Sequence, residues 1–219
     1  MGQLFNLNSP FMQRLNQLAD IIILNILVVI SSIPIITIGA AQTALYDVTG
    51  RLMRNEGYVW KNYWMAFKSN FKVATKIWLL FLPSGIVIAF GLLFYATSDA
   101  FGSKLALVLL CIACYFWLGA FAWAFPLQSK FENAVKNTLH NAFHCSTILF
   151  LRTIIMVAIN SIPVVLFFTA LPWFLGAGPI WILLWFAFGA RINAHVMSKP
   201  FSTMVEMAEA KEKNEQESA

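Results

Sequence analysis

Five apolar runs occupy most of this chain, and each is long enough to cross a membrane as a helix. A helix rises about 1.5 Å per residue, so about 20 apolar residues cover a hydrocarbon core of about 30 Å. Of the 219 residues, 59% are hydrophobic and only 11% are charged, which is far less charge than a soluble domain carries. The sequence therefore predicts one transmembrane domain, residues 1–198. The predicted spans are 18–38, 73–95, 105–125, 147–171 and 180–196.

The predicted fold class is all-α: a polytopic membrane helix bundle with about five transmembrane helices and additional amphipathic helices in the cytoplasmic interface. No small-residue cleavage site interrupts the first apolar run, so we expect it to be a retained span rather than a signal peptide. Pro34 lies inside this run and should kink it, with Ser31 and Ser32 bonding the freed carbonyls. Residues 199–219 form a polar tail, which we expect to be partly disordered beyond Ala210.

The link between the first two spans, residues 39–76, is rich in basic and aromatic residues. It holds six of the chain's fifteen Lys and Arg residues and only two acids, Asp47 and Glu56. Aromatic residues recur at i, i+3 and i+4 within residues 59–71, which predicts an amphipathic helix lying in the membrane interface. The link is predicted to be a platform that faces lipid or docks a partner. The platform residues are Tyr46, Arg51, Arg54, Trp60, Lys61, Trp64, Phe67, Lys68, Asn70 and Phe71.

The distribution of Lys and Arg predicts the orientation of the bundle. Outside the spans or at their ends, six lie in residues 39–76, two in residues 127–146 and three in the tail, whereas Arg14 and Lys104 stand on the opposite side. The positive-inside rule then places both links and the C-terminus in the cytoplasm. Because basic residues gather at span ends, the net charge of +5 indicates anionic lipid or an acidic partner and no nucleic acid.

Two polar residues, Asn25 and Asn160, fall near the centres of predicted spans. In hydrocarbon an amide needs hydrogen-bond partners, and bonds between helices contribute about 0.6 to 2 kcal/mol each. Asn25 and Asn160 either join helices in this way or line a path for a substrate. The sequence leaves both interpretations open.

Residues with catalytic or metal-binding chemistry are sparse. His140 and His144 are spaced i, i+4 without a third ligand, and Cys111 and Cys114 form a CxxC inside an apolar run, where a thiol is unreactive. The chain contains no phosphate-binding glycine loop and no hydrolase motif. We therefore expect no enzymatic activity, no cofactor and no metal.

The first two predicted spans are joined by the block IPIITIGAAQTALYDVTGRLMRNEGYVWKNYWMAFKSNFKVATK. This block resembles the YesL family of small integral membrane proteins from mostly Gram-positive bacteria. A second block beginning at Pro126 is also similar, and the resemblance covers about residues 18–193. The matching positions are Asn25, Pro34, Thr37, Gly39, Ala44, Leu45, Tyr46, Arg51, Glu56, Gly57, Phe67, Asn70, Phe71, Pro126, Phe131, Glu132, Asn137, Asn141 and Ala142.

The resemblance implies a multi-pass protein of the bacterial cell membrane. Genes of this family lie beside those of carbohydrate ABC transporters and glycan-degrading enzymes, which implies an accessory subunit or assembly factor for sugar uptake. The expected partners are then the lipid bilayer and a sugar ABC permease or its ATPase. The alternative is a stand-alone small-solute transporter or an oligomeric channel, in which a homo-oligomer would supply the pore.

Overall fold

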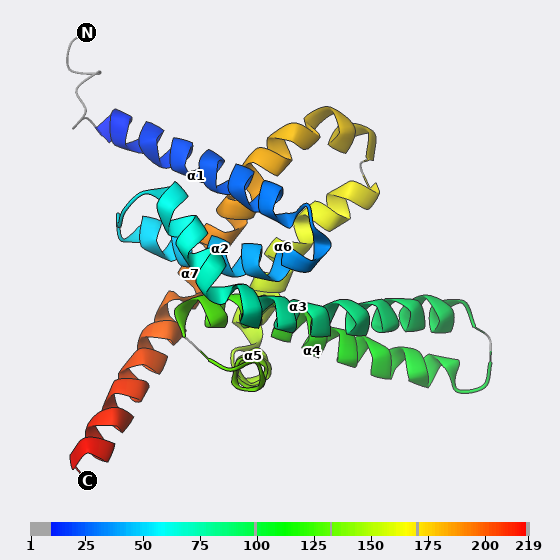
Figure 1. Cartoon of the computed structure of the whole chain (residues 1–219). Helices are drawn as coiled ribbons and strands as arrows, with labels where there is room; N and C mark the ends of the chain where they lie inside the picture. Colours follow the sequence, from blue (N-terminus) through cyan, green and yellow to red (C-terminus); the bar gives the residue numbers. More distant parts are fainter. Residues whose placement is uncertain (1–9, 99, 132, 170, 218–219) are drawn as a thin grey trace.

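The computed structural model describes residues 10–98, 100–131, 133–169 and 171–217, without the side chains at 10, 13, 14, 163, 164, 166–169, 171–184, 208, 209 and 211–217. This part of the chain is all helical and contains no strand, as predicted. Figure 1 shows a long two-helix arm that projects from a body of crossing helices. The elements are α1 (Pro10–Ser32), the 3-10 turn η1 (Ile35–Thr37), α2 (Ile38–Met53), α3 (Val59–Thr97), α4 (Ser103–Lys130), α5 (Val135–Ile148), α6 (Phe150–Thr169) and α7 (Leu171–Glu217).

The chain reverses around Pro34 instead of kinking there. Helix α1 ends at Ser32 because the residue before a proline avoids the helical conformation, and α2 starts six residues later. The hydroxyl of Thr37 donates to the carbonyl oxygens of Pro34 (2.7 Å) and Ser31 (2.5 Å). The first candidate membrane span is thus residues 15–32, shorter than the predicted 18–38. Ser31 also donates from its hydroxyl to the Val28 carbonyl at 3.2 Å, so Ser31 and Thr37 together bond the carbonyls at this reversal.

Small residues bring α2 close to α3. Ala40, Ala41 and Ala44 are completely buried, and a Cβ placed on Gly39 would lie 2.7 Å from the Cβ of Trp78. The hydroxyls of Ser31 and Tyr63 are hydrogen-bonded, which ties α1 to the same packing. One core cluster therefore forms where α1 and α2 meet the first half of α3, and a second surrounds Trp123 and Phe125 of α4.

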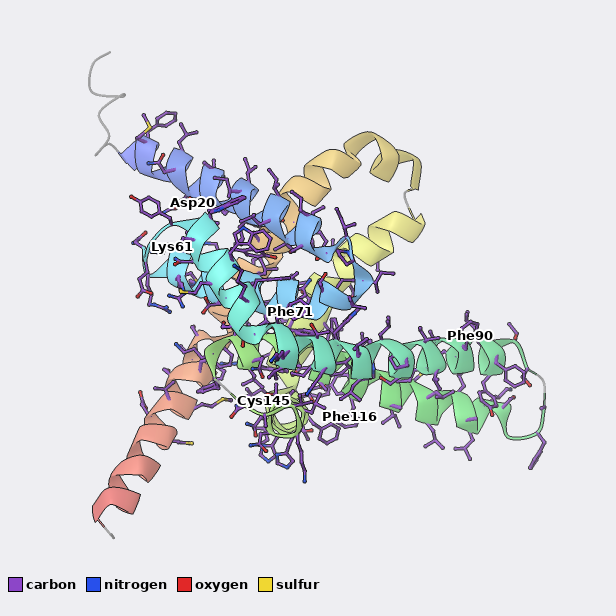
Figure 2. All side chains as sticks on the ribbon, viewed as in Figure 1. Asp20, Lys61, Phe71, Phe90, Phe116 and Cys145 are labelled. Atoms are coloured by element: carbon purple, nitrogen blue, oxygen red, sulfur yellow. The ribbon has the colours of Figure 1, made fainter. Side chains whose placement is uncertain are left out.

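Helix α3 combines two elements that the sequence analysis separated. It runs without interruption for 39 residues, about 58 Å, and includes both the amphipathic stretch 59–71 and the predicted span 73–95. Residues 77–97 carry no charge and cover about 31 Å, which matches a hydrocarbon core. These residues form the arm with α4, and side chains such as Val87 and Phe90, each 70% exposed, cover its surface (Figure 2).

Helix α4 continues past its predicted end at Phe125, through Pro126, to Lys130. At Leu149 the chain bends by 106° between α5 and α6, and Figure 1 shows α5 end-on beneath the arm. Helix α7 is continuous over 47 residues. It includes the predicted link 172–179, the span 180–196 and the tail up to Glu217, so the backbone of the tail is helical where disorder was expected.

Three helices of the described chain are long and apolar enough to cross a membrane, or four if the bent pair α5–α6 forms one span. The chain is thus an all-helical membrane protein by length and composition of its helices. The number five, and the division into a domain and a tail, stay predictions.

Candidate functional site

The first half of α3 carries the aromatic face that the sequence predicts. Trp60, Trp64, Phe67 and Phe71 follow one another along the helix, with ring centroids 6.1, 5.5 and 5.5 Å apart. Trp60 is 63% exposed, whereas the other three rings are half-buried. The aromatic face thus rests on the body and presents Trp60 to the outside.

A stripe of lysines lies beside this aromatic face. Lys61, Lys68, Lys72 and Lys76 recur at intervals of seven, four and four residues, so they share one side of α3, and all four are exposed. We call this set the lysine stripe; Figure 2 labels Lys61 at its start. None of the four forms an ion pair with a described residue. The stripe extends over 16 residues, about 22 Å from first to last, and presents four unneutralised positive charges.

The two platform arginines differ from the lysines of the stripe in that each forms an ion pair with a carboxylate. Arg51 Nε lies 2.8 Å from Asp47 Oδ2, and Arg54 Nε lies 2.7 Å from Glu56 Oε1. The hydrogen bond from Arg54 lowers the pKa of the Glu56 carboxyl. Asp47 and Glu56 therefore offset the charge of both arginines, and the lysines supply the free charge of the platform.

Tyr46 and Asn70 belong to the interior contacts. Asn70 Oδ1 accepts a hydrogen bond from Gln128 Nε2 (3.3 Å), whose Oε1 accepts one from Thr138 (2.7 Å), so this chain of bonds joins α3, α4 and α5. Tyr46 Oη accepts a hydrogen bond from Asn193 Nδ2 at 3.1 Å. Burial raises the pKa of Tyr46 against the opposing effect of hydrogen bonds from Asn193 and Asn160.

Asn25 and Asn160, which the sequence predicts to lie within the membrane, both join helices. Asn25 Oδ1 accepts a hydrogen bond from the backbone N–H of Ala187, and its Nδ2 donates to the Ile21 carbonyl. Asn160 Oδ1 accepts a hydrogen bond at 2.9 Å from Asn193 Nδ2. Asn193 is completely buried and was not singled out from the sequence, although it is an amide in an apolar run like Asn25 and Asn160.

A pocket of about 140 Å³ opens where α2, α4, α6 and α7 meet. Its polar lining residues are Gln42, Tyr46 and Asn160, and its walls include Phe121, Phe125 and Trp185. We call this the four-helix pocket. A second pocket of about 160 Å³, lined by Gln17, Asp20, Leu52, Asn55, Gly57 and Arg191, lies at the turn between α2 and α3.

The histidines and cysteines form no metal site in the part of the chain that the structure describes. The rings of His140 and His144 stack on α5 with centroids 6.1 Å apart, and no group of three His, Cys, Asp or Glu side chains occurs there. Cys111, Cys114 and Cys145 are free thiols. What the described residues offer is therefore a charged exterior face and a neutral pocket.

Comparison with known proteins gives one match. A model of the family described as "Protein of unknown function, DUF624" matches residues 21–92, which are 72 of the 219 residues. The matched range includes most of α1 and α3 and all of α2, and hence the lysine stripe and the aromatic face. No curated protein and no solved structure matches the chain.

Proposed function

We propose that this protein is a non-enzymatic, YesL-like membrane helix bundle that serves as an accessory subunit or assembly factor of a bacterial carbohydrate ABC transporter. The lysine stripe and Trp60 are its docking surface for the permease or its ATPase. The observation that carries the proposal is the stripe itself: four exposed lysines without a carboxylate partner among the described residues. The resemblance to the YesL family supports the choice of a sugar transporter as partner.

The chemistry of the stripe favours an acidic protein surface as its partner. Unpaired lysines in a row attract an anionic surface over their full length, about 22 Å, and charges at an interface set the rate and specificity of encounter. Trp60 supplies an exposed aromatic anchor of the kind that concentrates binding energy. Anionic lipid headgroups would attract the lysines too, but they would not select a particular protein.

The orientation belongs to the same proposal: the lysine stripe and the C-terminus face the cytoplasm, and the arm crosses the cell membrane. Phe101, at the tip of the arm, is fully exposed. In a cysteine-free background, Phe101→Cys should react with a membrane-impermeant maleimide in intact cells, whereas Lys61→Cys should react only after permeabilisation. The reverse pattern would contradict this orientation.

The docking test is affinity purification of the tagged full chain from its native membrane, followed by mass spectrometry. We expect a sugar permease or its ATPase in stoichiometric amount, released by moderate salt because the contacts are ionic. The triple variant with Lys61→Glu, Lys68→Glu and Lys72→Glu should lose the partner. A matched variant with Lys104→Glu, Lys130→Glu and Lys136→Glu makes the same change in net charge elsewhere and should retain it. Purification of the protein alone would contradict the docking role.

The alternative function is a stand-alone small-solute transporter or an oligomeric channel. The four-helix pocket favours it, since Asn160 lines that pocket together with Gln42 and Tyr46. Flux of labelled solutes into liposomes containing this protein alone separates the two functions. A transporter gives saturable uptake that Asn160→Leu abolishes, whereas an accessory subunit gives none.

A further inference from the structure

The four-helix pocket contains a hydrogen-bonding side chain that no described residue satisfies. Asn193 is completely buried and is not a lining residue, but its Nδ2 donates to two residues that are, Asn160 Oδ1 (2.9 Å) and Tyr46 Oη (3.1 Å). The side-chain amide of Gln42 forms no hydrogen bond with the described part of the chain and lines the pocket. The unpaired amide of Gln42, together with the Tyr46 and Asn160 side chains, is therefore suited to a polar ligand.

The lining residues also define the charge of that ligand. None of the residues around the pocket is Asp, Glu, Lys, Arg or His. An ionised ligand would find no opposite charge to pair with among these residues. Amide and phenol groups both donate and accept hydrogen bonds, which suits hydroxyl groups. The pocket chemistry therefore selects an uncharged molecule that carries hydroxyls.

The walls and the volume define its shape. Phe121, Phe125 and Trp185 supply flat apolar surfaces beside the polar side chains. A volume of about 140 Å³ is close to the roughly 150 Å³ of an engineered cavity that takes up benzene, so the open pocket accommodates a six-membered ring whose outer substituents extend through its opening. An aromatic wall contacts the apolar face of such a ring while the amides bond its edge.

We propose that the four-helix pocket binds one uncharged, hydroxyl-bearing six-membered ring, such as a monosaccharide or a cyclitol, through Gln42, Tyr46 and Asn160. The ring lies against Phe121, Phe125 and Trp185. This binding site is separate from the lysine stripe, so the ligand and the docking partner can be tested independently.

The test is isothermal titration of the full chain in phosphatidylcholine nanodiscs, because detergents with sugar headgroups would compete. The probes are methyl β-D-glucopyranoside and myo-inositol. Glucuronate supplies a charged ring of similar size, and cyclohexanol supplies a ring with one hydroxyl. We expect saturable binding of at least one of the two probes, at least tenfold tighter than either control. A preference between the probes identifies the ligand as a monosaccharide or a cyclitol.

Variants then locate the site. Gln42→Leu should weaken probe binding at least fivefold without disturbing the fold, because the Gln42 amide bonds no described residue. Tyr46→Phe should weaken it as well, and the matched variant Asn137→Leu, on the exposed side of α5, should bind like wild type. The proposal is overturned if neither probe binds, if glucuronate or cyclohexanol binds as tightly, or if Gln42→Leu leaves the affinity unchanged.

Discussion

The side-chain oxygen of Asn25 in α1 accepts a hydrogen bond of 3.1 Å from the backbone N–H of Ala187 in α7. The two residues are 162 positions apart, and Asn25 is completely buried. The Nδ2 group of the same side chain donates to the Ile21 carbonyl at 2.9 Å. Both the oxygen and the nitrogen of the Asn25 amide are thus hydrogen-bonded, and the bond to Ala187 joins α1 to α7.

Asn25→Leu should therefore loosen α1 from α7. The substitution removes the acceptor of a buried N–H group, and we expect the free energy of unfolding to fall by about 1–2 kcal/mol. Thermal unfolding in one fixed detergent measures the effect. Asn16→Leu, an exposed position of the same helix, is the control and should unfold like wild type. Equal stability of the two variants would show that the Asn25 contact contributes nothing.

The two glycines of α2 should respond oppositely to alanine. A Cβ on Gly39 would lie 2.7 Å from the Cβ of Trp78, so Gly39→Ala must push α2 away from α3 and should cost about 1–3 kcal/mol. A Cβ on Gly50 meets nothing nearer than 3.8 Å, and alanine favours helices by about 1 kcal/mol over glycine. Gly50→Ala should thus be neutral or stabilising in the same unfolding assay. A Gly39→Ala variant as stable as Gly50→Ala would contradict the close packing.

Thr153→Val should destabilise the contact between α4 and α6. Trp123 Nε1 donates to Thr153 Oγ1 at 2.9 Å, and both side chains are completely buried. Valine keeps the shape but removes the acceptor, so the indole N–H loses its partner at a cost of about 1–3 kcal/mol. Thr147→Val, at an exposed position, is the matched control. Unfolding midpoints that shift equally for both would argue against the buried bond.

Tyr46 should make stability depend on alkaline pH. Burial raises the pKa of Tyr46 above its ordinary value of 10.0, so above about pH 10 the unfolded chain releases a proton that the folded chain retains. The free energy of unfolding therefore falls as pH rises from 10 through the pKa of Tyr46 in the folded chain. Below pH 10 the contribution of neutral Tyr46 to the free energy of unfolding is fully present. Tyr46→Phe should flatten the slope of unfolding midpoint against pH in this range. Tyr58→Phe, which removes an exposed hydroxyl, should leave the slope as in wild type.

The sequence predicts the helical membrane class and the helix after Gly39, because apolar runs and helical periodicity are local features. It separates residues 59–71 from 73–95 because Lys72 and Lys76 end the apolar pattern. Lysine is nonetheless a good helix former, so the backbone of α3 continues through both. Charge marks where a helix leaves the hydrocarbon, and it does not mark where the helix ends.

The candidate site is only partly predictable for a different reason. Helical spacing identified the aromatic and basic faces of α3, and the structure places Trp60, Lys61 and Lys68 at the surface. The sequence could not show that Tyr46 contacts Asn193, because that contact joins residues 147 positions apart. The lining of the four-helix pocket comes from four helices, and no local pattern of one helix reveals it.

Because α3 is continuous, the number of residues between the lysine stripe and the arm fixes both the distance and the angle between them. One residue inserted after Lys76 would advance the stripe by about 1.5 Å and rotate it by about 100° relative to residues 77–97. The direction in which the positive charges point is thus set by the same helix that is anchored in the bilayer. A partner docked on the stripe, as proposed above, would be held at a fixed angle around the arm, and its rotation would turn the arm with it.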